Sequence, residues 1–381
     1  MNLRERAMAV TPGGAQTRSK RATAFPVGYP QFLEAGRGAR VRDEHGKSYI
    51  DWICGLGAIS LGYRHTAVDV AAARQMERGV SFSLPTALEV EVAEDLRKML
   101  PAADMVRFCK TGSEANEGAC RIARVATGRD HIISIGYHGW HTMQDAALRK
   151  PIGVPNLVEQ VVHGFPMHDP HLPFEYINES YGAVAGVIVE VMRDDPPPAG
   201  YVESLRQQCD REGALLIFDE MVTGFRWAIG GAGEFFGVTP DLATFGKGMA
   251  NGWPLAAIVG RGHLMEHASY VSGTFGGETV SLAACQATLE VYRRAPVIQE
   301  MWSTGLALMA GFNALAKDHG LRMEGYAVHP RIVGERRDAF IGAVASHGIL
   351  FHPSGFNVSL AHRAAEVDET LAACRRALES L

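Results

Sequence analysis

The chain has 381 residues, 47% of them hydrophobic and 21% charged, as in an ordinary globular protein. Its net charge is −5, and its 37 basic and 42 acidic residues are interspersed without a basic stripe, so neither nucleic acid nor an anionic membrane is expected as a partner. The charged first residues lack the apolar core of a secretory signal, and no apolar run approaches the roughly 20 residues that span a bilayer. Six scattered cysteines without a CxxC pair indicate a reducing compartment, so we expect a cytoplasmic protein.

The first hundred residues predict a lead-in, a hairpin and two helices. Residues 1 to about 30 read as an irregular lead-in. The segment ARVRDEHGKSYID alternates in polarity around His45-Gly46, which predicts a hairpin over residues 40–51. Amphipathic patterns predict helices at about 66–78 and 85–100.

The central part of the chain alternates short apolar runs with helical stretches. The runs predict strands at 106–109, 131–135, 185–189, 215–218, 242–245 and 255–259. Helices between such strands favour a mainly parallel sheet, and ligands bind such sheets at the carboxyl ends of the strands. Residues 281–319 read as helical with a break at Pro296, mixed segments follow, and a last helix is predicted at about 364–381. We therefore expect an α/β protein with an N-terminal segment at 1–45, a large domain at 46–280 and a smaller α+β domain at 281–381.

Two of the predicted strands deliver residues of complementary chemistry. The run ALLIF ends at Asp219-Glu220, and the run LATF ends at Lys247, which lies between two glycines. Pyridoxal 5′-phosphate (PLP) needs a carboxylate near its pyridinium nitrogen and a lysine that forms a Schiff base with its aldehyde. Asp219 and Lys247 are therefore the predicted catalytic residues. Taken singly, each is equally an exposed surface group, which is the usual state of a lysine or an aspartate.

Further polar residues follow the other predicted strands. The segment Thr111-Gly112-Ser113 opens a helix, where free amides and hydroxyls bind a phosphate; the alternative is an ordinary serine N-cap. Tyr137 and His138 follow the strand predicted at 131–135. One interpretation is that an aromatic ring there stacks on a planar cofactor, and the other is that both are ordinary polar side chains at the edge of the sheet. Glu190 ends an apolar strand and so lies exposed or has a cationic partner.

Two other groups of residues have a simpler interpretation. The turn at residues 272–277 carries hydroxyls and amides, and either contacts a phosphate or is plain turn chemistry. Five histidines lie in loops without a spacing that fixes a ligand set, so no metal is expected: His138, His141, His163, His168 and His171.

The chain resembles the class III PLP-dependent aminotransferases, and most closely their glutamate-1-semialdehyde 2,1-aminomutase branch. The resemblance covers nearly the whole chain. It rests on the ordered segments TPGG, YIDW, KTGSEANEGACRIARVATGRDHI, GYHGWH, VIVE, LLIFDEMVTGFR, FFGVTPDLATFGKGMANGWPLAAIVGR, SGTFGGE and SLAH.

The resemblance implies a fold type I homodimer with active sites at the subunit interface. It implies that Lys247 forms the Schiff base, that Asp219 contacts the pyridinium nitrogen and that Gly112 and Ser113 hold the phosphate. It further implies that Tyr137 stacks on the ring and that Thr274 reaches the phosphate of the neighbouring subunit. We include His138 and Glu190 in the cofactor site, although Val191 stands where the family has proline after the glutamate.

Departures from the aminomutase pattern fall on the substrate side. The aminomutase pattern has SWG in the early glycine-rich segment, where this chain has Gly55-Leu56-Gly57. A substrate-contacting tryptophan is therefore absent. The segment after Lys247 reads ANGWP instead of GGGLP. Cofactor residues are kept while substrate residues change, which favours an aminotransferase that moves an amino group from a small-molecule donor to a carbonyl acceptor.

Several activities stay open on the sequence. An aminomutase is the nearest alternative, followed by a PLP racemase or epimerase and by a non-catalytic α/β binding protein. No arginine can be assigned to a substrate carboxylate, and Arg226 and Arg18 are candidates only.

Overall fold

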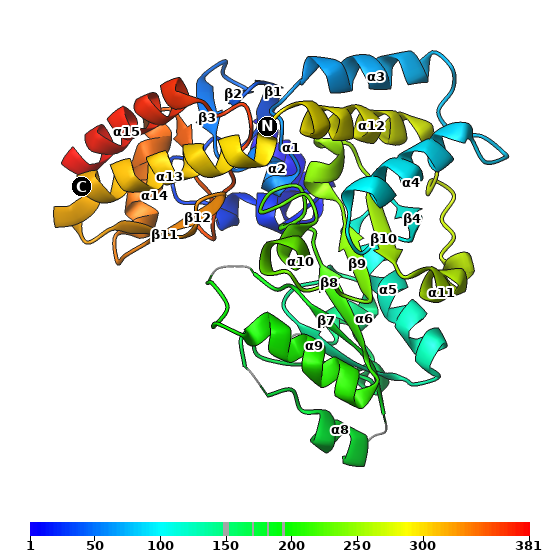
Figure 1. Cartoon of the computed structure of the whole chain (residues 1–381). Coiled ribbons are helices and arrows are strands. Elements are labelled where there is room, and N and C mark those ends of the chain that lie inside the picture. Colours follow the sequence, from blue (N-terminus) through cyan, green and yellow to red (C-terminus); the bar gives the residue numbers. More distant parts are fainter. Residues whose placement is uncertain (148–151, 170, 181–182, 193–194) are drawn as a thin grey trace. The chain divides into compact units, whose positions relative to one another are not determined.

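The computed structural model describes residues 1–147, 152–169, 171–180, 183–192 and 195–381. The chain forms two compact units, coloured along the sequence in Figure 1. One unit comprises Met1–His65 together with Gln299–Leu381, and the other comprises Thr66–Ile298. The predicted domain boundaries at residues 45 and 280 stay a prediction.

A seven-stranded sheet lies at the centre of the unit Thr66–Ile298. In chain order its strands are β4 (Met105–Cys109), β5 (His131–Ile135), β6 (Val162–Gly164), β7 (Val184–Val189), β8 (Leu215–Asp219), β9 (Leu242–Phe245) and β10 (Ala256–Gly260). Their spatial order is β4-β10-β9-β8-β7-β5-β6, and β10 runs antiparallel to both of its neighbours. The prediction of a mainly parallel α/β sheet is confirmed. The predicted strands are all present, and β6 is one more, whose three residues are too few to give an apolar run.

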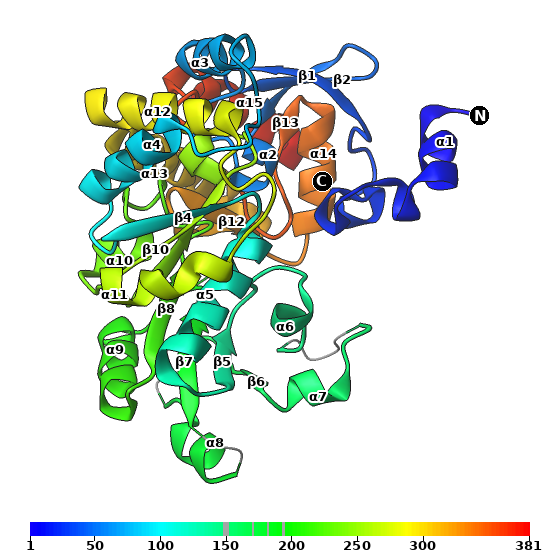
Figure 2. The same cartoon turned by 90° about the vertical axis from the view of Figure 1, so that its right-hand side faces the viewer.

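The helices of this unit are α3 (Thr66–Met76), α4 (Ala87–Met99), α5 (Gly112–Thr127), α6 (Thr142–Asp145), α7 (Asn156–Glu159), α8 (Phe174–Ser180), α9 (Tyr201–Glu212), α10 (Gly231–Phe236), α11 (Gly262–Met265) and α12 (Thr279–Arg294). Some of them pack on the sheet, whereas α3 packs on α12. The alanine-rich face of α5 packs on the sheet in one buried cluster with Ile188, Ile217 and Ile258. Helix α9 contacts β7 and β8, and both helices lie beside the sheet in Figure 2. The strands β5, β7, β9 and β10 are buried at every position, as their continuous apolar sequences require, whereas β4 and β6 are partly exposed.

The start of α5 is fixed by a capping box. The hydroxyl of Thr111 accepts a hydrogen bond from the Glu114 N–H at 3.3 Å, and the Glu114 carboxylate accepts from the Thr111 N–H at 2.9 Å. The helix ends at Gly128, whose φ of 65° lies in the left-handed region that glycine adopts without strain. The capping box aims the first turn of α5 at the carboxyl edge of the sheet.

Parallel pairing brings the ends of several strands to that one edge. The strands β5, β7, β8 and β9 run parallel, so the residues that follow them gather on the same side. Strand β4 joins them there because it is antiparallel to β10, which is antiparallel to β9. The predicted polar residues at the strand ends are therefore neighbours.

The other unit holds the terminal segments. Its four-stranded sheet has the order β1 (Leu33–Arg37), β2 (Arg40–Asp43), β3 (Ser48–Asp51), β13 (Ile349–Leu350). A second hairpin joins β11 (Arg322–Tyr326) and β12 (His329–Val333), and the helices are α1 (Leu3–Val10), α2 (Cys54–Gly57), α14 (Arg337–Ser346), α15 (Ala364–Glu379) and most of α13 (Val297–Ala316). The predicted hairpin over 40–51 is confirmed as β2–β3.

The prediction of an irregular lead-in is wrong for its first residues. Residues 3–10 form α1, which a capping box between Asn2 and Glu5 stabilises. The irregular remainder contains only short 3-10 turns between Pro12 and Ala24. In the part of the chain that the structure describes, none of the helices combines the length and apolarity that crossing a membrane requires.

Candidate active site

Asp219 is the centre of a buried hydrogen-bond network at the end of β8. Its side chain is 4% exposed. Its Oδ2 accepts from Asn116 Nδ2 at 2.8 Å and lies 2.8 Å from His138 Nδ1, while its Oδ1 accepts from the Met221 N–H at 3.0 Å. The amide oxygen of Asn116 in turn accepts from the Thr244 hydroxyl at 2.6 Å. These three contacts around one carboxylate fix its direction.

The ring of His138 contacts two buried oxygen atoms. Its Nε2 is 3.0 Å from the carbonyl oxygen of Ile135, and its Nδ1 is 2.8 Å from Asp219 Oδ2. The ring is held between the backbone of β5 and the Asp219 carboxylate. His138 therefore holds the Asp219 carboxylate in position.

Lys247 stands just after the strand next to Asp219. In the register of β8 and β9, Asp219 is paired with Thr244, three residues before the lysine. Lys247 has a φ of 46°, which costs a bulky side chain about 1 kcal/mol or more. Strain of this kind is concentrated at functional sites, where surrounding structure holds a side chain in one direction.

The backbone at Gly246 and Gly112 has no room for a side chain. A Cβ at either position would lie 2.8 Å from the sulfur of Met221. Met221 thus packs between the loop that carries the lysine and the first turn of α5. Only glycine lets these two loops approach this closely.

The first turn of α5 presents two N–H groups, those of Gly112 and Ser113, for which the described residues supply no acceptor. The Ser113 hydroxyl lies beside them and accepts from the Trp140 N–H at 3.4 Å. A Cβ on Gly139 would lie 2.1 Å from this hydroxyl oxygen, so the loop after β5 crosses the helix terminus at a glycine. Open amides on a helix of 16 residues form an anion site, and the N-cap itself is Thr111, not Ser113.

Tyr137 and Glu190 are neighbours at the ends of β5 and β7. The Tyr137 side chain is 48% exposed, and its backbone N–H donates to the buried Glu190 carboxylate at 3.3 Å. A Cβ on Gly136 would lie 2.7 Å from the Cβ of Glu190. Glu190 therefore holds the loop that presents the tyrosine ring.

Thr274 lies away from this network. It is exposed and lines a cavity of about 270 Å³ on the flank of α5, together with residues that include Glu114, Glu117, Arg121 and His141. Of the two candidate arginines, Arg226 is 1% exposed, and Arg18 is exposed in the other unit.

Three further residues of this site were not predicted from the sequence: Asn116, Thr244 and Met221. A signal exists for Asn116, because its buried face of α5 otherwise carries Ala115, Ala119 and Ala123. A lone amide on an apolar face needs a polar partner. Thr244 and Met221 give no such signal, since both fit an ordinary strand and loop.

The neighbour of Asp219 has a separate role. Glu220 is buried, and its carboxylate accepts from the N–H groups of Ala232 at 2.7 Å and Gly233 at 2.9 Å, as well as from the Thr223 hydroxyl. Burial raises the pKa of Glu220 to about 7 in spite of these donors. Its contacts tie the loop after β8 to the start of α10.

The histidines do not form a metal-binding cluster among the residues for which the structure gives positions. His138 belongs to the Asp219 network, and a ring nitrogen of His163 lies 3.1 Å from one of His131. His168 packs its ring edge-on against Tyr201.

Comparison with known proteins identifies the family. A family model described as aminotransferase class-III matches residues 24–378. The chain belongs to the class III aminotransferases. This aminotransferase depends on PLP, and it transfers an amino group between a small-molecule donor and a carbonyl acceptor.

Individual relatives place this class III aminotransferase among transaminases. It is 33% identical over 331 residues to the 3-aminobutyryl-CoA aminotransferase of Cloacimonas acidaminovorans, covering 84% of this chain and 79% of the relative. The structure of the FumI protein of Sphingopyxis sp. MTA144 with PLP matches with a TM-score of 0.92 at 31% identity, over 99% of this chain and 95% of that one. An omega-transaminase of Sphaerobacter thermophilus matches with a TM-score of 0.87 at 26% identity, over 99% and 96%.

The aminomutase likeness is one of fold. A glutamate-1-semialdehyde aminomutase of Pseudomonas aeruginosa matches with a TM-score of 0.83 at 22% identity, over 99% of this chain and 93% of that one. The predicted fold, PLP-dependent transferase type I, is confirmed by these matches.

The described residues fit PLP. An enclosed carboxylate, Asp219, suits a protonated ring nitrogen, and the two open amides of Gly112 and Ser113 with their glycine-lined surroundings suit a phosphate. Lys247 follows β9, which pairs directly with the strand that ends at Asp219.

Proposed function

We propose that Lys247 carries the cofactor in this aminotransferase and that Asp219 holds the ring nitrogen protonated. The observation that carries the proposal is the buried Asn116–Asp219–His138 network on the strand adjacent to the one that leads to Lys247. An ionised carboxylate enclosed on one side by three donors has lone pairs left for one more N–H.

PLP, when bound, supplies an electron sink for the substrate carbon that loses a proton. The Lys247 amine would remove that proton as a base and return a proton as an acid. Asp219 favours protonation of the ring nitrogen, and a protonated ring withdraws electrons more strongly. His138 and Asn116 hold Asp219 in direction and charge.

Gly112 and Ser113 bind the phosphate through their N–H groups and the serine hydroxyl, and the ring of Tyr137 covers the cofactor plane. Thr274 and its neighbour Phe275 are exposed, which supports the action of Thr274 in the site of a second copy of the chain. The working enzyme is therefore a homodimer in which each copy completes the other's phosphate site.

The substrate carries its amino group on the carbon β to a carboxyl-derived carbonyl, or at the end of a chain. The support is the similarity to a 3-aminobutyryl-CoA aminotransferase and to an omega-transaminase, together with Gly55-Leu56-Gly57 in place of the aminomutase SWG. Half-reaction spectroscopy with a 3-aminobutyryl thioester, a terminal amine and alanine tests this. Conversion of the enzyme by α-amino acids alone would refute the substrate class.

Lys247→Ala tests the assignment of the lysine. The variant is expected to lose about 10⁴-fold in turnover, because it removes a group that both carries the cofactor and moves the proton. Borohydride treatment of the wild type should fix the cofactor to the peptide that contains Lys247. Lys98→Ala, which removes an exposed lysine of α4, is the matched control. An unchanged borohydride-sensitive absorbance band in Lys247→Ala would overturn the assignment.

The aminomutase branch is the second candidate, supported by the ordered motifs and by the shared fold. The wild-type enzyme would be mixed with one amino-aldehyde and no separate acceptor. We expect little product from the aminotransferase, whereas full isomerisation would assign the chain to the aminomutases.

A further inference from the structure

Lys110 and Glu278 form an ion pair outside the catalytic network. The distance from Lys110 Nζ to Glu278 Oε2 is 2.7 Å, and the side chains are 18% and 11% exposed. Lys110 Nζ also donates to the Ser281 hydroxyl at 3.1 Å and to the Pro254 carbonyl at 3.1 Å. The three donors of the ammonium group therefore have three acceptors.

The partners of Lys110 come from three segments of the predicted cofactor site. Lys110 itself precedes Thr111, the N-cap of α5, by one residue. Pro254 lies between Lys247 and β10, and Glu278 ends the turn that carries Thr274. One side chain thus joins the phosphate turn of α5, the loop after the lysine and the Thr274 turn.

Glu278 is held as firmly as its partner. It is the N-cap of α12, where its Oε1 accepts from the Val280 N–H at 2.6 Å and its Oε2 accepts from the Ser281 hydroxyl at 2.6 Å. Burial raises the pKa of Glu278, but the hydrogen bonds from Lys110 and Ser281 outweigh it, so the pKa lies below its usual value. The carboxylate is therefore charged at neutral pH, as an ion pair requires.

An ion pair of this kind adds little net stability, because the cost of removing both charges from water offsets their attraction. Its main effect is on geometry. A misplacement of about 1 Å in an enzyme site can lower the reaction rate by on the order of 100-fold, so geometry has a large effect. The ion pair connects the two turns and so limits how far one can move relative to the other.

We propose that Lys110 and Glu278 are a positioning pair that sets the distance between the phosphate turn of α5 and the Thr274 turn. The proposal rests on the proposed function, in which both turns bind cofactor phosphate. Since Thr274 acts on the second copy in that scheme, the pair couples the phosphate site of one subunit to that of the other. In that scheme both residues act on the cofactor only through the turns that they connect.

The test compares PLP with pyridoxal, which lacks the phosphate. Equilibrium dialysis gives the dissociation constants of both for wild type, Lys110→Met, Glu278→Gln and the double variant. The ratio of the pyridoxal constant to the PLP constant is expected to fall by about 10-fold or more in each single variant. The double variant should fall no further, because its two changes remove one shared interaction. Lys110→Arg, which keeps the charge, should restore part of the ratio.

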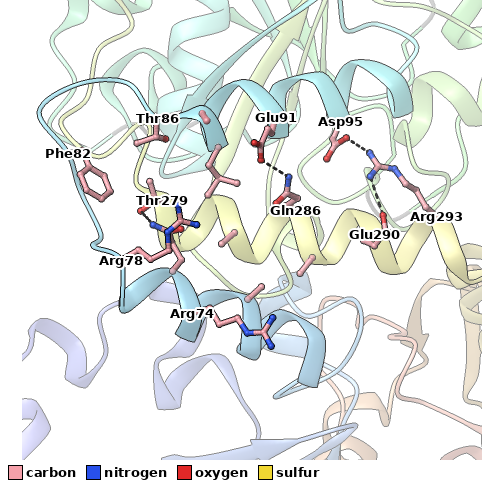
Figure 3. Close-up of a pocket in the computed structure, with 16 residues that line it drawn as sticks. Arg74, Arg78, Phe82, Thr86, Glu91, Asp95, Thr279, Gln286, Glu290 and Arg293 are labelled. Atoms are coloured by element: carbon pink, nitrogen blue, oxygen red, sulfur yellow. Dashed lines mark hydrogen bonds and ion pairs between the residues drawn. The ribbon is translucent and has the colours of Figure 1, made fainter.

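Arg293 and Asp95 provide the control pair. Their side chains are 2.8 Å apart between α12 and α4, beside the cavity of about 870 Å³ shown in Figure 3. Arg293→Met and Asp95→Asn are expected to change thermal stability but not the ratio. A ratio within about twofold of wild type in both Lys110→Met and Glu278→Gln would overturn the proposal.

The experiment distinguishes an incorrect positioning role of Lys110 and Glu278 from an incorrect assignment of Lys247. Dialysis measures binding whether or not Lys247 forms a covalent bond, so the ratio is also measured in the Lys247→Ala background. If Lys247 is not the cofactor lysine, that substitution leaves PLP binding unchanged while the effect of Lys110→Met on the ratio persists. If the pair does not position the phosphate turns, the ratio is unaffected in both backgrounds.

Discussion

The end of β8 is predicted to contact the cofactor of its own chain, and the turn at residues 272–277 is predicted to contact the cofactor of a second copy. The two regions are built differently. Asp219 is 4% exposed and surrounded by partners from α5, the loop after β5 and its own loop. Thr274 is exposed, and its neighbour Phe275 is 57% exposed. In the proposed function, the region that contacts the ring nitrogen is therefore buried within one chain, whereas the turn that reaches the phosphate is exposed. A carboxylate that stabilises a ring cation acts more strongly when it is buried, whereas a turn that binds the phosphate of another subunit has to be accessible to it.

Asp219→Asn would sharpen this comparison most. The amide keeps the shape but cannot stay charged opposite a ring cation, so turnover is expected to fall by about 10²- to 10³-fold. The oxygen of the introduced amide would still accept from Asn116, so the fold should persist. Steady-state kinetics and thermal unfolding of the same variant would check both statements. Turnover within a factor of about three would show that the carboxylate charge is not used.

A mixture of Lys247→Ala and Thr274→Ala subunits would test the role of the exposed turn. Thr274→Ala alone is expected to weaken PLP binding by about 10-fold, the value of one hydrogen bond to a charged group. If Thr274 serves the second copy, a mixed dimer contains one site with both residues intact, and activity appears that neither homodimer has at limiting PLP. If Thr274 serves its own chain, no mixed site is intact. Absence of complementation in verified mixed dimers would refute the shared site.

Glu220 predicts a smaller effect, on stability instead of turnover. Its pKa of about 7 lies above the ordinary 4.5, so the folded state keeps its proton while the unfolded state loses it. The contribution to the free energy of unfolding is full below pH 4.5 and decreases between pH 4.5 and 7, by about 3 kcal/mol in total.

Urea denaturation of wild type and Glu220→Gln at pH 4.5 and pH 8 would measure this contribution. Subtracting the two proteins at each pH cancels the other titrating groups. The wild type should lose stability relative to the variant as the pH rises. An equal difference at both pH values would place the pKa of Glu220 near its ordinary value.

The sequence by itself determined the class of fold and the family. Apolar runs of strand length alternate with capped helices, and burial on both faces leaves few other arrangements than a parallel sheet. The same pattern placed Lys247 and Asp219 at strand ends. Their chemistry pointed to PLP before any contact was known, and the ordered motifs named the class III family.

Only the tertiary structure decided how these residues are supported. Asn116 is 103 positions from Asp219 and bonds to it because α5 packs across the sheet. Lys110 and Glu278 are 168 positions apart and meet where the end of β4 lies beside the start of α12. Local sequence fixes caps, turns and strand ends. Which residues become partners in a buried network depends on packing between distant segments, and no periodic pattern in the sequence indicates those partners.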